Sequence, residues 1–166
     1  DRNADAARRF ADQVGARVVS LSEAAGADIV CTATPSRTPF VQARWGRPGA
    51  HINAMGADAP GKRELSTETL ERAEVYIDDI HQAAASGEIN VPLADGDFTL
   101  DDLAGTLGEV VAGVLPKPSV ATTTIFDSTG LAIQDVSLAR AIYDAARCQS
   151  IGQEIDLMGL SSRARS

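Results

Sequence analysis

The chain has 166 residues, of which 44% are hydrophobic, 4% are aromatic and 23% are charged, and its formal net charge is -8. This composition is typical of one globular domain with an apolar core and excludes an intrinsically disordered chain. The acidic balance and the few aromatic side chains argue against binding of nucleic acid or of a membrane surface, and no apolar run approaches the roughly 20 residues of a membrane-spanning helix.

The first elements alternate between helical and extended patterns. Asn3 is a typical helix N-cap and Gly15 a typical helix stop. The predicted elements, in chain order, are a helix over Ala4–Val14, a strand over Arg17–Val19, a helical turn over Ser22–Ala25 and a buried strand over Asp28–Ala33. A strand, a crossover helix and another strand are typical of a parallel sheet.

The same alternation continues to the end of the chain. The further predicted elements are a strand over His51–Met55, helices over Thr67–Arg72 and Ile80–Ser86, a strand over Val75–Asp78, a helix over Leu100–Leu115, a strand over Ala121–Asp127 and a long helix over Asp135–Ile151. The helix over Leu100–Leu115 rests on apolar residues at helical spacing. The fold class that we predict is α/β, a Rossmann-like doubly wound parallel sheet.

The first residue indicates where such a sheet is cut. In a dinucleotide-binding sheet, an acidic residue about 20 positions after a glycine fingerprint binds the adenosine ribose. Asp1 takes that place, and the sequence before it is absent. We therefore expect the C-terminal half of a dinucleotide-dependent enzyme, truncated at its N-terminal side. Its expected parts are a partial Rossmann domain over residues 1–133, a helix over residues 134–159 that returns to pack on a missing N-terminal domain, and a frayed tail over residues 160–166.

Four segments that follow predicted strands are rich in small and polar residues. They are residues 32–36, 53–62, 78–79 and 127–130. Ligands bind at the carboxyl ends of the strands in an open parallel sheet. The second segment is the most specific, because a glycine-bounded loop holds both Asp58 and Lys62. A carboxylate beside a cofactor can exchange protons, and the lysine could neutralise a phosphate or steady the carboxylate.

Simpler interpretations exist for several polar residues. A single aspartate in a loop of glycine and proline is usually a turn former, which is the alternative for Asp58. His51 begins a strand and is better explained as a structural histidine than as a general base. Asp78 and Asp79 are adjacent, but no cluster of histidine, cysteine and carboxylate residues has the spacing of metal ligands, so we expect no metal site.

The second segment also carries a family resemblance. The stretch His51-Ile-Asn-Ala-Met-Gly-Ala-Asp-Ala-Pro-Gly-Lys-Arg-Glu-Leu65 resembles the signature of the ornithine cyclodeaminase/µ-crystallin family. Three further stretches agree with it in order and spacing: Gly87–Val91, Leu107–Gly113 and Phe126–Asp135. The resemblance runs from Asp1 to about Ala146. The amino-acid sequences of the Gly87–Val91 and Phe126–Asp135 stretches are most similar to those of the archaeal-type alanine dehydrogenase branch.

The resemblance implies NAD as the cofactor and a set of site residues. The implied cofactor contacts are Asp1 at the ribose, Ile52, Asn53, Ala54 and Met55 beside the nicotinamide, and Thr34, Lys62 and Ser128 elsewhere on the dinucleotide. The resemblance also implies that Asp58 is the catalytic acid/base and touches substrate, together with Thr129. The family's other substrate residues belong to the N-terminal half. A carboxylate such as Asp1 favours NAD over its 2′-phosphorylated relative, although the neighbouring Arg2 could pair with that phosphate.

The activity implied is that of an NAD-dependent L-amino-acid oxidoreductase, which deaminates an amino acid such as alanine to a 2-oxo acid through an imine. Two alternatives stay open: an ornithine cyclodeaminase, which forms proline and ammonia, and a non-catalytic, µ-crystallin-like ligand-binding protein. The expected partners are a small amino-acid substrate and a second copy of the chain in a homodimer. Two widely separated cysteines, Cys31 and Cys148, favour reduced thiols and a cytoplasmic location.

Overall fold

The computed structural model of the protein describes residues 1–153 and residue 155. The chain forms two compact units, residues 1–130 and residues 131–166. The expected frayed tail over residues 160–166 lies outside the described residues. The expected division into residues 1–133 and residues 134–159 stays a prediction.

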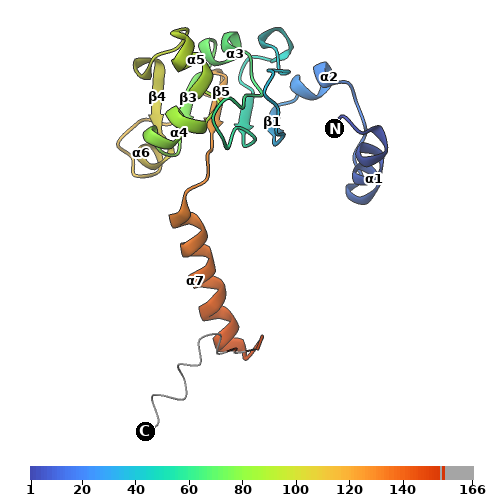
Figure 1. Ribbon diagram of the computed structural model, residues 1–166, viewed down its shortest axis with the longest axis vertical. Helices are drawn as coiled ribbons and strands as arrows, with labels where there is room; N and C mark the ends of the chain where they lie inside the picture. The colour runs from blue at the N-terminus through green and yellow to red at the C-terminus, as the bar shows by residue number, and fades with distance from the viewer. Residues whose placement is uncertain (154, 156–166) are drawn as a thin grey trace. The chain divides into compact units, whose positions relative to one another are not determined.

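The first unit contains a five-stranded sheet in which all neighbouring strands are parallel (Figure 1). The strands are β1 over Ile29–Thr32, β2 over His51–Ala54, β3 over Glu74–Ile77, β4 over Leu103–Thr106 and β5 over Thr124–Asp127. Their order in the sheet is β1-β2-β5-β3-β4, so every connection between neighbours is a crossover. The predicted α/β class with a parallel sheet is confirmed.

Two helices precede the first strand, and further short helices connect the strands. They are α1 over Ala4–Val14, α2 over Leu21–Ala25, α3 over Thr67–Glu71, α4 over Ile80–Ser86, α5 over Asn90–Asp95 and α6 over Leu107–Val111, with 3-10 turns over Ala43–Trp45 and Leu100–Asp102. The bounds of α1 and α4 are those predicted. Both helices are capped by side chains, because Asn3 accepts from two backbone N–H groups of α1 and Asp79 from two of α4.

One face of the sheet carries the core. The alternating residues of the strands that point to this face are buried, among them Val30, Ile52, Val75 and Ile125. They pack with apolar side chains of the connecting segments, including Leu65, Leu70, Ala83, Ile89 and Phe98. The opposite face is more open, and Ile29 on the edge strand β1 is 67% exposed. The sheet is therefore held together mainly from one side in the described part of the chain.

Two of the predicted elements are wrong. Residues Arg17–Val19 form no strand, because no strand of the described residues pairs with them. The predicted helix over Leu100–Leu115 is a 3-10 turn, strand β4 and helix α6. Pairing of β4 with β3 overrides the helical spacing, and Gly105, with φ of 141°, adopts a backbone that a helix excludes. The helix α5 was not predicted.

The second unit contains helix α7 over Ala132–Gln149, which begins three residues before the predicted Asp135. It has no buried residue. Its large apolar side chains are all more than half exposed, namely Ile133, Val136, Leu138, Ile142 and Tyr143. None of the helices within residues 1–153 combines the length and apolar character that crossing a membrane requires.

Candidate functional site

The polar segments that follow the strands meet at one edge of the sheet. In the observed register Thr32 lies beside Ala54, Ala54 beside Asp127, and Asp127 beside Ile77. The four strands β1, β2, β5 and β3 thus end at the same level. The residues after them, which form four separate polar segments in the sequence, are neighbours across this edge.

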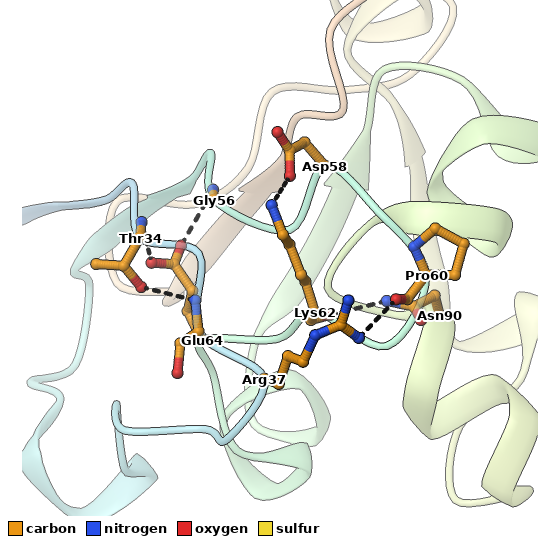
Figure 2. A network of polar contacts seen from close by, with 9 residues as sticks. Thr34, Arg37, Gly56, Asp58, Pro60, Lys62, Glu64 and Asn90 are labelled. Carbon is orange, nitrogen blue, oxygen red and sulfur yellow. Dashed lines mark hydrogen bonds and ion pairs between the residues drawn. The ribbon is translucent and has the colours of Figure 1, made fainter.

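The loop after β2 carries an ion pair between Asp58 and Lys62 (Figure 2). The Asp58 side chain is 63% exposed, whereas that of Lys62 is only 20% exposed. The hydrogen bond from the Lys62 ammonium, followed by its charge, lowers the pKa of Asp58 from the usual value. At neutral pH Asp58 is therefore an accessible, ionised carboxylate, and its ion pair with Lys62 makes it a weaker base than a free aspartate.

The end of this loop is fixed by Asn90, the first residue of α5. Asn90 Oδ1 accepts from the backbone N–H of Gly61 at 2.9 Å, and its amide donates to the carbonyl oxygen of Lys62 at 2.9 Å. Arg37 adds a hydrogen bond of 3.1 Å to the carbonyl oxygen of Pro60. Figure 2 shows these contacts gathered below the Asp58–Lys62 pair. The backbone that carries both charged side chains is therefore anchored from two other segments.

Glu64 joins the segments that follow β1 and β2. Its carboxylate accepts from the backbone N–H of Thr34 at 2.6 Å and from that of Gly56 at 3.1 Å (Figure 2). Glu64 is fully buried. A Cβ atom at position 56 would lie 2.4 Å from the Thr34 carbonyl oxygen and 2.5 Å from the Glu64 carboxylate, so the close approach needs glycine. Glu64 thereby fixes Thr34 relative to the loop of Asp58.

The turn after β5 is held by Asp78, which follows β3. The Asp78 carboxylate accepts from the backbone N–H groups of Thr129 and Gly130 at 2.7 and 2.9 Å. It also accepts from the hydroxyl of Thr129 at 2.9 Å and, more weakly, from that of Ser128 at 3.4 Å. Ser128 is buried and Thr129 is half-buried. Both predicted site residues are therefore oriented from the neighbouring strand β3.

The other predicted site residues differ in exposure. Ile52 and Ala54 are buried in the core face, and Met55 is 48% exposed just beyond the strand end. Asn53 lies on the opposite face, where its Oδ1 is 3.2 Å from Nε2 of His51. Asp1 lies apart from the strand-end segments, in an exposed position where it accepts from the backbone N–H of Asn3. The structure thus brings together the residues after the strands, while Asp1 stands at the start of α1.

His51 has partners on both sides of its ring. Its Nδ1 lies 2.7 Å from the hydroxyl of Thr124 on β5, and its Nε2 contacts Asn53. These contacts tie neighbouring residues of the sheet together, as a structural histidine does. Across residues 1–153 and 155, no group of three or more histidine, cysteine or carboxylate residues is placed to hold a metal ion.

Two carboxyl groups are buried although neither has a predicted role, and one of them, Asp127, opens the predicted polar segment over residues 127–130. Glu88 and Asp127 are fully buried. Burial is the main cause that raises the pKa of each to about 7, and nearby acidic side chains add to it. The available signal was that both lie in motifs that carry the family resemblance, Glu88 next to Gly87 and Asp127 at the end of a predicted strand.

Comparison of the sequence with models of known families gives a match over residues 1–150, to the model of the ornithine cyclodeaminase/mu-crystallin family. The chain belongs to this family. Within the family, the chain is 45% identical over 156 residues to an alanine dehydrogenase of Archaeoglobus fulgidus, a match that covers 90% of this chain and 48% of the relative. The chain thus spans about half the length of the curated relatives that it matches.

Solved structures of family members have the same fold. An archaeal alanine dehydrogenase dimer with bound NAD has a TM-score of 0.89 and 43% identity, over 95% of this chain and 51% of that one. A Δ(1)-pyrroline-2-carboxylate reductase of Thermococcus litoralis, in complex with NADH and L-proline, has a TM-score of 0.83 and 31% identity over 92% of this chain and 50% of that one. The fold and the family that the sequence indicated are confirmed.

Proposed function

We propose that this chain is the cofactor-binding half of an NAD-dependent oxidoreductase that acts on a small L-amino acid. The observation that carries the proposal is the convergence of four small, polar segments at the carboxyl edge of a parallel sheet, where such folds bind dinucleotides. Similarity to an alanine dehydrogenase solved with NAD supports the same cofactor here. By the same similarity, the full-length protein forms a homodimer.

The residues at this edge fit a flat dinucleotide. Ala54 and Gly56 carry little or no side chain, and Met55 offers an exposed apolar surface at the end of β2. In the proposal, Ile52–Met55 lie beside the nicotinamide, and Thr34, Lys62 and Ser128 contact other parts of the dinucleotide. Asp1 accepts hydrogen bonds from the adenosine ribose. Its exposure and its place before α1 suit this role.

The proposed chemistry begins with Asp58. NAD, when bound, supplies the acceptor for a hydride that leaves the Cα of the amino acid. The ionised carboxylate of Asp58 takes a proton from the substrate amine, and Lys62 keeps that carboxylate charged and oriented. The resulting imine is hydrolysed by water to a 2-oxo acid and ammonia. Thr129, which Asp78 orients, contacts the substrate.

A cyclodeaminase would use the same carboxylate differently. In that reaction the side-chain amine of ornithine attacks the imine, ammonia leaves, and reduction of the cyclic product gives proline. The position of Asp58 in the Gly56–Lys62 loop supports either route, because the matching residue is the acid/base of the cyclodeaminase branch. The two reactions differ in their redox balance, since the dehydrogenase accumulates NADH and the cyclodeaminase returns the hydride.

The test is an assay of the full-length protein with NAD and a panel of L-amino acids, with NADH followed by absorbance and ammonia measured separately. We expect alanine or a similar small amino acid to produce NADH and ammonia in equal amounts. Ammonia and proline from ornithine without net NADH would instead establish the cyclodeaminase. A protein that binds small ligands and turns over none of the substrates would contradict the enzymatic proposal.

A further inference from the structure

Three buried carboxyl groups, those of Asp127, Glu88 and Glu64, lie in series behind the candidate site. Asp127 is the last residue of β5, Glu88 lies between α4 and α5, and Glu64 lies in the segment before α3. All three are fully buried. None of them belongs to the predicted catalytic or cofactor-binding set.

Each carboxyl group accepts hydrogen bonds from the backbone beside the next one. The backbone N–H of Ile89, the residue after Glu88, donates to Asp127 over 3.4 Å. Glu88 in turn accepts from the backbone N–H groups of Glu64 and Leu65 at 2.9 Å each. Buried N–H groups need such acceptors, and the loss of one costs more than the net gain of the bond.

The series ends at the candidate site. Glu64 accepts from the backbone N–H groups of Thr34 and Gly56, which follow β1 and β2 (Figure 2). The turn that carries Glu88 also carries Asn90, which fixes Gly61 and Lys62 at the far end of the Asp58 loop. The two ends of this loop are thus tied to the same turn between α4 and α5.

We propose that Asp127, Glu88 and Glu64 act as positioning residues. Through their hydrogen bonds, the end of β5 holds the α4–α5 turn in place, and this turn then holds the Thr34 turn and the Asp58–Lys62 loop. Glu88 is the central member. Without it, the N–H groups of Glu64 and Leu65 lose their acceptor, and the Glu64 side chain loses its fixed backbone. In the enzyme, the loss of Glu88 would displace Asp58 and Thr34 and leave the remainder of the sheet intact. This consequence for activity rests on the proposed function.

The charges around Glu88 make the arrangement sensitive to pH. The charged groups that act on Glu88 are Asp127 and Glu64, and the one that acts on Asp127 is Asp78; all of them are acidic. Burial and these neighbours raise the pKa of Glu88 to about 7. A buried carboxyl group with a raised pKa stabilises the native, hydrogen-bonded arrangement while it is neutral, and it favours local opening to water once it is ionised. Between pH 6 and pH 8 the equilibrium constant for local opening should therefore rise about tenfold.

The test is hydrogen–deuterium exchange of the full-length protein without cofactor, corrected for the intrinsic effect of pH on exchange. In Glu88→Ala we expect protection of residues 56–65 and of the Thr34 turn to fall roughly tenfold or more, which corresponds to the loss of a buried acceptor. Protection of strand β3 should be unchanged. The exposed Glu71→Ala is the matched control and should behave as the wild type.

Glu88→Gln separates the acceptor from the charge. Its amide oxygen still accepts from the backbone, so we expect it to restore protection of residues 56–65 and to reduce the dependence of that protection on pH between 6 and 8, with the remaining dependence due to Asp127. The wild-type pH series is a measurement that needs no variant. Protection of residues 56–65 that is equal in all proteins and at both pH values, or that falls equally throughout the sheet, would overturn the proposal.

Activity provides a separate readout. If the proposed function holds, Glu88→Ala lowers kcat and also raises KM for NAD, because it displaces Asp58 together with the cofactor contact Thr34, and Glu88→Gln restores most of both. A wild type without dehydrogenase or cyclodeaminase activity would refute the proposed function and leave the exchange result to decide the positioning role. Unchanged kcat in Glu88→Ala, in an active enzyme, would refute the positioning role alone.

Discussion

Replacement of Asp127 by asparagine should make the full-length protein more stable at pH 8 than the wild type. Asp127 Oδ1 is buried and has no hydrogen-bond partner among the described residues, so the ionised carboxylate is poorly compensated. Burial is the main cause that raises the pKa of Asp127 from 3.8 to about 7, and repulsion from Asp78 adds to it. Asparagine keeps one acceptor for the backbone N–H of Ile89 and carries no charge.

The size and sign of the effect follow from this pKa. A carboxyl group whose pKa is higher in the folded than in the unfolded protein favours folding below its unfolded-state pKa, and this contribution is lost as the pH rises through the folded-state value. For Asp127 the loss falls between about pH 4 and pH 7. Between pH 5 and pH 8 it amounts to about 3 kcal/mol at most, at about 1.4 kcal/mol per unit of pKa difference.

Thermal unfolding of the wild type and of Asp127→Asn from pH 5 to pH 8 measures this difference. The unfolding temperature of the variant, relative to the wild type, should rise by several degrees over that range, since 1 kcal/mol corresponds to roughly 2–4 °C for a domain of 150–250 residues. Asp101→Asn, at an exposed position, serves as the control with no such trend. A destabilisation by Asp127→Asn that is the same at every pH would refute the reasoning.

Four further outcomes are expected. Asp58→Asn in the full-length protein should lower turnover by about two to four orders of magnitude with little change in cofactor affinity. Steady-state kinetics and NADH titration measure these two quantities. Unchanged turnover would indicate that Asp58 only forms the turn. Kinetics with both cofactors should show a preference for NAD over NADP, and the reverse would overturn the role of Asp1. Gly87→Ala should destabilise the protein by about 1–3 kcal/mol in denaturant unfolding, because the added Cβ would lie 2.4 Å from Asp127 Oδ2. The control Gly108→Ala should be nearly neutral, because its added Cβ would have no neighbour closer than 3.8 Å. Equal effects of the two substitutions would contradict the steric argument. Residues 1–166 expressed alone should be aggregation-prone and should not bind NAD measurably in calorimetric titration, and micromolar binding by a monodisperse sample would contradict this.

The sequence by itself determined the helices and strands whose signals are local. Asn3 and Gly15 bound α1 because an N-cap side chain and a left-handed glycine act on the nearest turn, and Asp79 and Gly87 do the same for α4. Because ligands bind at the carboxyl ends of parallel strands, the sequence also identified the four segments of the candidate site before their register was known. The motif around Asp58 and Lys62 indicated the family.

Only the tertiary structure decided which local pattern prevails at β4. Apolar spacing over Leu100–Leu115 favoured a helix, but Leu103–Thr106 forms a strand, because its backbone pairs with β3. A capping box between Thr106 and Glu109 then begins α6 inside the predicted helix. A residue's own segment does not reveal the strand beside which it will lie.

The buried carboxyl groups show the same division between sequence and structure. Glu64, Glu88 and Asp127 are far apart in the sequence, and each resembles an ordinary surface acid until the fold brings its neighbours together. Their burial and their backbone partners depend on how β5, the α4–α5 turn and the loop before α3 pack. Desolvation and hydrogen bonding act through space, so the sequence supplies these carboxyl groups and the tertiary structure alone sets their pKa values and connects them to the candidate site.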